Sequence, residues 1–523
     1  DDVMKSLATL QTYWLPRNTQ IWQERKIRDL DVNESMLRDK AFSNQETRAI
    51  DNHPQVYWDW AVASMANRQF KWIIPSQASK KDDAKTGKLE RLAYGIDWSL
   101  NALSMKKLGE PWRFQLAEQI CSGWYCFYPN VEKVGDSLEF SLEFFDPTTI
   151  YPEVDKHGLR RLTRHYRAYL GDVREQAVLQ GGTNNLAGDV MKVVTVTDYW
   201  ERKETGVYNM LIVDGEEVLP YEKVKDEEEI PFIVGAVGGR GVESWVDSNL
   251  STSKNIGRGI LTPLVRVYQQ SNLTHNMARM RMRMNMFPTL VDYTQEGEGL
   301  IEPTQMKTDS SNILHAKMGE DAKYLQMPNV PVDVKLELEH DASMIQQGSV
   351  PPQLFGVNAP QVASGYLGKL LENQATMRLG RSVVSYKRAA EEAMTRLFRK
   401  MQRLNMTVTL QGQNLRKRGM TGYFIEEFKS KDVPVLFSIR AEHQLETAID
   451  KAAIANTAAA KVAAGISSRR RAMEETDVED PYQESMDILE EGALQLALQN
   501  AAVAALQLER QAKFFQDQGD TMM

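Results

Sequence analysis

A stretch of about forty residues without proline, 365–405, constrains the fold of this chain more than any other feature. It follows a segment, 348–360, whose three prolines and two glycines prevent a regular helix. Ser364 is suited to cap a helix that starts after it, and at roughly 1.5 Å per residue that helix is ~60 Å long. We therefore predict a loop over 348–364 followed by a helix longer than most compact domains need.

Opposite charges concentrate in two separate segments. The predicted long helix carries nine basic residues against three acids, whereas the segment 472–492 carries nine acids and no lysine or arginine. The whole chain has a net charge of −8, so it does not have the excess of positive charge by which a DNA-binding protein grips phosphates. Both charged segments can be solvated faces or can pair with each other.

The length of 523 residues exceeds what one hydrophobic core usually holds, so we expect two or three structural regions. Apolar and aromatic residues recur at helical spacing from residue 1 to about 130. Between 124 and 235 the period changes to two, which predicts one twisted, mostly antiparallel sheet. The expected fold class is α+β, predominantly α. The only cysteines, Cys121 and Cys126, match neither a zinc site nor a disulfide framework.

The middle of the chain predicts two helices around a small insert. The first helix is expected over 258–286 and the second over 331–347, although Val334, Leu336 and Leu338 alternate and also suit a strand. The insert, 287–330, contains short strand-like runs between glycines and prolines and is expected to form a small α/β module. After the long helix we predict a strand pair, 407–410 with 433–439, and then helices over 445–464 and 481–516 with a break at Gly465.

This order of elements resembles the portal proteins of tailed bacteriophages, which form the head-to-tail connector. Two motifs add to the likeness: Val350-Pro351-Pro352-Gln353-Leu354-Phe355-Gly356 before Ala363-Ser364-Gly365, and Gly465-Ile466-Ser467-Ser468 before Asp477-Val478-Glu479-Asp480-Pro481. The resemblance covers about 130–490 in order and implies the following regions: wing (1–257), first stem helix (258–286), clip (287–330), second stem helix (331–347), tunnel loop (348–364), long wing helix with a strand pair (365–440), and helical crown (441–523).

The resemblance further implies a ring, twelve-fold in that family, at one vertex of the capsid. Its partners would be further copies of the chain, the major capsid protein, the terminase large subunit, head-tail adaptor and tail proteins, and double-stranded DNA in the channel, with no membrane. The protein would be in the virion, and in the host cytoplasm during assembly. Neighbouring subunits of such a ring need complementary charge. The intersubunit candidates are Arg378, Arg381, Lys387, Arg388, Glu474, Glu475, Asp477, Glu479 and Asp480.

Two groups of residues are candidates for the DNA channel. The polar, uncharged residues at the predicted loop, Gln347, Ser349, Gln353, Asn358 and Gln361, suit a channel in which DNA slides without being held. Arg279, Arg281 and Arg283 at the end of the first stem helix could touch DNA or a neighbouring clip. Alternatively, these three cations complement the negative end of the helix dipole.

Motifs of catalysis are absent from the sequence. The lysines of Gly87-Lys88 and Gly368-Lys369 are each followed by leucine, so no phosphate-binding loop is formed. The seven histidines show no metal-ligand spacing, and no G-x-S-x-G sequence occurs. We therefore predict no catalytic, cofactor-binding or metal-binding residue, and a structural protein instead of an enzyme. A DNA-processing enzyme on a helical scaffold and another head-to-tail ring protein are the alternatives.

Overall fold

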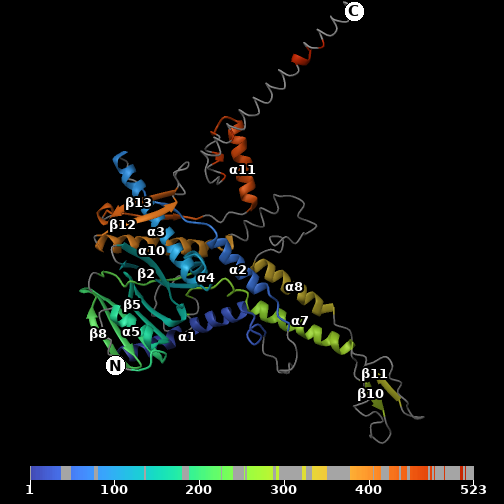
Figure 1. Cartoon of the computed structure of the whole chain (residues 1–523). Helices are drawn as coiled ribbons and strands as arrows, with labels where there is room; N and C mark the ends of the chain where they lie inside the picture. The colour runs from blue at the N-terminus through green and yellow to red at the C-terminus, as the bar shows by residue number, and fades with distance from the viewer. Residues whose placement is uncertain are drawn as a thin grey trace, which may run out of the picture.

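The computed structural model shows helices and antiparallel strands in largely separate stretches of the chain (Figure 1). The described residues are 51% helical and 27% strand, in agreement with the expected α+β class. The structure describes residues 2–36, 49–75, 80–134, 137–179, 188–224, 227–238, 253, 256–286, 290–293, 321–324, 332–349, 377–404, 406–413, 423–434, 437–443, 448–468, 472–473, 476, 488, 507–510 and 513.

The first 121 residues are mainly helical, as expected. Their elements are α1 (Asp2–Arg28), α2 (His53–Ala66), α3 (Lys80–Leu108) and α4 (Trp112–Cys121), with the short strand β1 (Lys71–Ile73) between α2 and α3. The strand β1 pairs with β14 (Arg440–Glu442), which lies far away in the sequence. The N-terminal helices and the chain that follows the long helix therefore share one folded body.

The strands between 124 and 236 form two sheets, so the prediction of a single sheet is wrong. One sheet has the order β3-β2-β9 and the other the order β4-β5-β6-β7-β8, with every pair antiparallel. The chain leaves the first sheet at η1 (Pro147–Thr149), where Asp146 caps the turn and Pro147 has no amide hydrogen to continue the ladder. A helix that the strand pattern did not indicate, α5 (Leu170–Leu179), follows β5. The strands are β2 (Trp124–Val134), β3 (Ser137–Phe144), β4 (Ile150–Asp155), β5 (Gly158–Tyr169), β6 (Val193–Lys203), β7 (Gly206–Val213), β8 (Glu216–Lys223) and β9 (Ile233–Ala236).

Both helices expected around the insert are present as α7 (Val265–Met286) and α8 (Val332–Gly348). Helix α7 begins seven residues later than expected, and the alternating residues of α8 are helical and do not form a strand. Between them, β10 (Leu290–Tyr293) pairs with β11 (Asp321–Tyr324). The other predicted strand of the insert, 312–314, lies outside the described residues, as do 350–376, which hold most of the predicted loop and the start of the long helix.

The described part of the long helix is α10 (Gly380–Leu404). The strand pair after it differs from the expectation, because β12 (Thr407–Gln413) pairs with β13 (Tyr423–Lys429) and not with 433–439. Pro434 has no amide hydrogen and cannot donate a hydrogen bond to a neighbouring strand. Val433 directly follows η4 (Ser430–Asp432) and is buried. The next helix, α11 (Ala448–Ala463), ends before Gly465, whose φ of +70° stops it as expected.

Helix α10 lies at the centre of the largest hydrophobic core. Tyr386, Ala390, Leu397 and Phe398 recur on one face and are each 0% exposed. This face contacts α4, β2, β9 and β14. The amphipathic pattern of α10 therefore joins the N-terminal helices to the three-stranded sheet.

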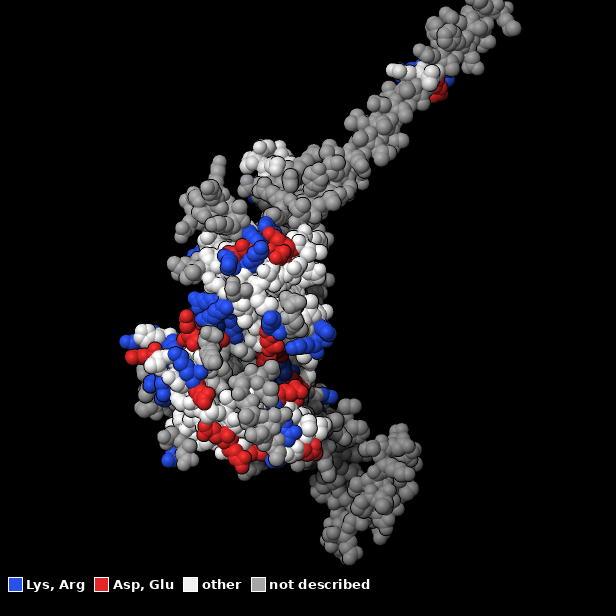
Figure 2. Space-filling model, turned by 60° about the vertical axis from the view of Figure 1, so that its left-hand side comes forward, with Lys and Arg blue, Asp and Glu red and all other residues white. Residues whose placement is uncertain are grey.

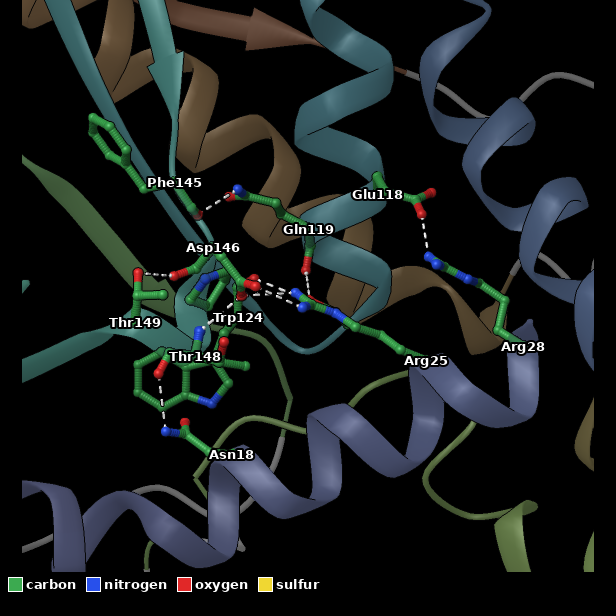
Figure 3. Close-up of polar contacts among 12 residues, drawn as sticks. Asn18, Arg25, Arg28, Glu118, Gln119, Trp124, Phe145, Asp146, Thr148 and Thr149 are labelled. Atoms are coloured by element: carbon green, nitrogen blue, oxygen red, sulfur yellow. Dashed lines mark hydrogen bonds and ion pairs between the residues drawn. The ribbon is translucent and has the colours of Figure 1, made fainter. Parts of the chain in front are cut away.

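Polar contacts fix α1 against the same body (Figure 3). Arg25 donates two hydrogen bonds to the carboxylate of Asp146, at 2.8 and 2.9 Å, and Arg28 forms an ion pair with Glu118 of α4. Asn18 donates to the carbonyl oxygen of Thr148 at 3.0 Å. These contacts hold α1 at the point where the chain passes from one sheet to the other.

Replacing Asp146 tests this attachment. The substitution Asp146→Ala removes both bonds from Arg25 and the cap that the amide of Thr148 donates at 2.9 Å, so we expect the free energy of unfolding to fall by about 2 kcal/mol. Urea unfolding measures this loss. The control is Asp155→Ala, which removes an aspartate that accepts from one amide and one arginine in an exposed turn, and it should cost less than about 1 kcal/mol. Equal losses of stability in the two variants would show that the contact with α1 stabilises the fold no more than the bonds of an exposed turn do.

Candidate functional site

The most distinctive feature of the structure is a helical hairpin that projects from the body. In Figure 1, α7 and α8 lie side by side and lead away from the sheets to β10 and β11 at the tip. The two helices are antiparallel, because Gly348 at the end of α8 meets Leu264 just before α7. A Cβ at Gly348 would lie 2.3 Å from the Leu264 side chain, so a larger residue there would require Leu264 to move. We define the hairpin root as the first half of α7, the end of α8 and the residues that contact them.

A row of buried amide side chains attaches α7 to the body. Gln269, Asn272 and Asn276 lie on one helix face and are 7%, 4% and 6% exposed. Their amide nitrogens donate to the carbonyl oxygens of Glu34, Ser35 and Ala49 at 2.8, 2.9 and 2.6 Å.

The side-chain oxygens of the two asparagines are also used. Asn276 accepts from the amide of Ala49 at 2.9 Å, and Asn272 accepts from the amide of Asp51 at 3.0 Å. This row was not predicted from the sequence, because the helix was assigned from its apolar residues. The signal was the repetition of amide residues at positions 269, 272 and 276.

A second junction joins α2, α7 and the end of α8. The two ring nitrogens of His53 lie 2.9 Å from the hydroxyl of Tyr268 and 3.3 Å from the hydroxyl of Ser349. Burial lowers the pKa of His53, partly opposed by Asp51, so the ring is neutral at pH 7. Arg378, just before α10, donates to the carbonyl oxygen of Ser349. This bond places the first residues of α10 beside the end of α8.

Helix α1 supplies the third contact of the root. Glu24 is 1% exposed, and one of its carboxyl oxygens accepts hydrogen bonds from Gln20, at 3.0 Å, and from Thr262, three residues before α7. Its other oxygen has no hydrogen-bond partner. Burial raises the pKa of Glu24 to about 7, although the bonds from Thr262 and Gln20 oppose the shift.

The DNA-channel candidates are not gathered in one place. Ser349 is 0% exposed and bonded within the root, so its assignment to a DNA-facing surface is wrong in this conformation. Gln347 is exposed near the root, whereas Arg279 is exposed and Arg281 half-buried towards the tip of the hairpin. The side chain of Arg283, in α7, and the residues Gln353, Asn358 and Gln361 lie outside the description.

The basic residues of α10 divide into two groups. In the second half, Arg396, Arg399, Lys400 and Arg403 form ion pairs of 3.4 to 3.8 Å with Glu227, Glu228 and Glu229 of the same chain. The expectation of one cationic helix therefore holds only for the first half. There, Arg381 and Arg388 are exposed, Lys387 is half-buried, and none of the three forms an ion pair with a described residue.

The acidic intersubunit candidates, Glu474, Glu475, Asp477, Glu479 and Asp480, lie outside the described residues. On the face shown in Figure 2, the described basic and acidic side chains occur in small neighbouring groups and do not form one continuous basic surface. Such a surface would favour encounters with nucleic acid at any sequence. The described side chains of this face therefore do not form such a surface.

Two other kinds of site have no candidate in the described part of the chain. No group of three or more His, Cys, Asp or Glu side chains is placed to hold a metal ion. None of the described helices is long and apolar enough to cross a membrane. Cys121 and Cys126 are both buried and are not joined in a disulfide, and burial raises the pKa of each thiol.

The raised pKa of Glu24 predicts a pH-dependent stability. A carboxyl group that ionises at about 7 when folded and at 4.5 when unfolded stabilises the fold below pH 4.5, and this contribution is lost as the pH rises to 7. The loss is about 3 kcal/mol. We expect Glu24→Gln to remove this pH-dependent loss of stability and to raise the melting temperature at pH 8 more than at pH 5. The exposed control Glu204→Gln should change neither value, and a pH profile unchanged in Glu24→Gln would contradict the assignment.

Two adjacent glutamines of α7 test the buried row. Gln269 is buried and bonded to Glu34, whereas Gln270 is exposed on the other side of the helix. Gln269→Ala leaves a carbonyl oxygen without its partner and should lower the free energy of unfolding by about 1.5 kcal/mol. Gln270→Ala should leave it unchanged. Hydrogen exchange should locate the effect in the first half of α7, and equal exchange in both variants would count against an attachment through this row.

Comparisons with known proteins add no relative. No model of a known protein family matches the chain, and no curated protein matches it in sequence.

Proposed function

We propose that the chain is a portal subunit of a tailed bacteriophage: a structural protein that forms a ring at one capsid vertex. The ring is the channel for genome packaging and ejection, and it binds terminase and later the tail adaptors. The observation that carries the proposal is the projecting antiparallel hairpin with a strand pair at its tip. It corresponds to the stem and clip that the resemblance implies, followed by the long helix.

The surface of the hairpin supports assembly with further copies. Met277, Met282 and Leu336 are 47%, 49% and 57% exposed, and among the described side chains of α8, 333–348, only Asp341 and Ile345 are buried. Two helices that leave this much apolar surface in water gain stability when neighbouring hairpins cover it. In a ring, every hairpin has one neighbour on each side.

The charges of the hairpin are also suited to a ring. Helix α7 carries four arginines and no acid, whereas α8 carries four acids and one lysine. Neighbours in a ring meet through two different surfaces, and α7 of one copy facing α8 of the next would bring unlike charges together. Arg381 and Arg388 of α10 offer a second positive surface, for which the acidic segment 472–492 is the complementary partner.

A channel of this kind acts by shape and not by chemistry. The exposed acids of α8, Asp333, Glu337 and Glu339, repel phosphates, so a lumen lined by this helix would let DNA slide in both directions. The force for packaging comes from the terminase in the family that the chain resembles. The role of the body is then to hold each hairpin at a fixed angle.

Electron microscopy of the purified full chain tests the proposal. We expect rings with a central channel wide enough for duplex DNA. Arg279→Glu places a like charge opposite the acids of the neighbouring α8 at every interface and should convert rings to smaller species. The control is Arg160→Glu, the same charge change at an exposed position of β5, which should leave the rings intact. A monodisperse monomer at high concentration, also with capsid components present, would contradict the proposal.

A further inference from the structure

A second candidate site lies between the two sheets, separate from the hairpin. A cavity of about 1480 Å³ opens between β2 and β3 on one side and β5 to β8 on the other. No residue of α7 or α8 lines this cavity, so the site is independent of the proposed function. Facing sheets normally fill the space between them with interlocking side chains, and here that space is open.

Asp198 lies in the wall of this cavity, and one of its two carboxyl oxygens accepts no well-formed hydrogen bond. It lies on the central strand β6, is 0% exposed, and accepts one hydrogen bond from Asn209 at 2.8 Å on one carboxyl oxygen. The other oxygen accepts no hydrogen bond of good geometry; the indole nitrogen of Trp200 is close enough to oppose the rise in the pKa of Asp198, but it does not complete a bond either. A buried acceptor without a partner costs about 1 to 3 kcal/mol, so this oxygen is a place for a donor from outside the chain.

The nearest cation does not supply that donor. Arg164 is directly opposite Asp198 on β5, but its guanidinium lies 3.8 Å from the ring centre of Phe145 and 3.7 Å from that of Tyr166. Arg164 forms no ion pair of 4.0 Å or less with any described carboxylate. Burial raises the pKa of Asp198, and a cationic group brought to the free oxygen would lower it again.

The rest of the lining is suited to a positively charged, partly apolar occupant. It contains seven acidic residues against four basic ones. Its base is aromatic, because Tyr128, Phe145 and Trp200 all pack around Phe232 with ring centres 5.6 to 5.8 Å apart. Aromatic faces beside carboxylates bind both alkyl chains and cations.

The size of the cavity decides between two kinds of occupant. Sites for small molecules usually measure about 300 to 1,000 Å³, and this cavity is larger. Its walls are strands, which an extended peptide can lie along with alternate side chains turned to each sheet. We propose that the cleft between the two sheets binds an extended, lysine- or arginine-rich segment of a partner protein, with a basic side chain of that segment bonded to Asp198.

Fluorescence anisotropy of the full chain with two labelled peptides tests this proposal. In the first peptide lysine alternates with valine, and in the second glutamate alternates with valine. We expect the wild-type chain to bind the basic peptide and not the acidic one. Asp198→Asn should weaken binding about tenfold, because a charged hydrogen bond is lost. Glu204→Gln, an exposed charge change outside the cleft, should bind as the wild type does.

Two further measurements keep the test decisive. Circular dichroism establishes that Asp198→Asn is folded; if it is not, Glu143→Gln replaces it, since Glu143 is an exposed acid in the same lining and should also weaken binding. Equal affinity of the folded cleft variant and Glu204→Gln would show attraction to the surface at large and would overturn the proposal. Competition with spermidine, a small triamine, is the second measurement. If spermidine displaces the basic peptide at an equal concentration of positive charge, the cleft is a small-cation site and the peptide proposal is wrong.

Discussion

The buried face of α10 is the constraint on which the rest of the structure depends. Three alanines, Ala389, Ala390 and Ala393, lie on this face among larger apolar residues and are at most 2% exposed. Small side chains allow the strands and α4 to approach the helix closely. Polar groups at the edges of the face add direct bonds: Arg396 donates to the carbonyl oxygens of Ile230 and Phe232 at 2.7 and 3.1 Å, and Glu391 accepts from the amide of Ala441 at 2.8 Å. The helix therefore determines both where the three-stranded sheet lies and where β14 meets β1.

The same helix connects this core to the hairpin. The backbone oxygen of Ser349, at the end of α8, accepts from Arg378, two residues before α10, while its hydroxyl reaches His53 of α2. The hydroxyl also donates to the carbonyl oxygen of Ile345 at 2.6 Å. A shift of α8 would therefore have to break polar contacts with two elements of the body. Hairpin and body are coupled here through buried hydrogen bonds, which are costly to leave unmade.

Local patterns in the sequence predicted elements better than they predicted partners. Helices α7, α8, α10 and α11 followed from periodicity and from prolines and glycines, because these features act within a few residues. The partner of β12 and the division into two sheets could not be predicted from these patterns, since the residues of a strand do not specify which strand pairs with it. The charges of α10 were read as free because the acids that neutralise half of them, Glu227 to Glu229, are about 170 residues away. Ser349 and the amide row were misplaced or missed for the same reason: polarity alone does not distinguish a solvated side chain from one bonded in a core.

The buried amides of α7 explain how a projecting hairpin can have a defined direction. Helix α7 is ~33 Å long, so an error of about 10° at its root would move the tip by about 6 Å. Apolar packing alone tolerates small rotations, because its energy depends mainly on the area buried. Hydrogen bonds lose strength quickly as angles change, and Gln269, Asn272 and Asn276 fix the helix along about two turns of its length. Since these three side chains bond to backbone oxygens, those bonds do not depend on which side chains residues 34, 35 and 49 carry. The ring that we propose would need the same angle in every copy, and among the described residues this row of amides fixes that angle.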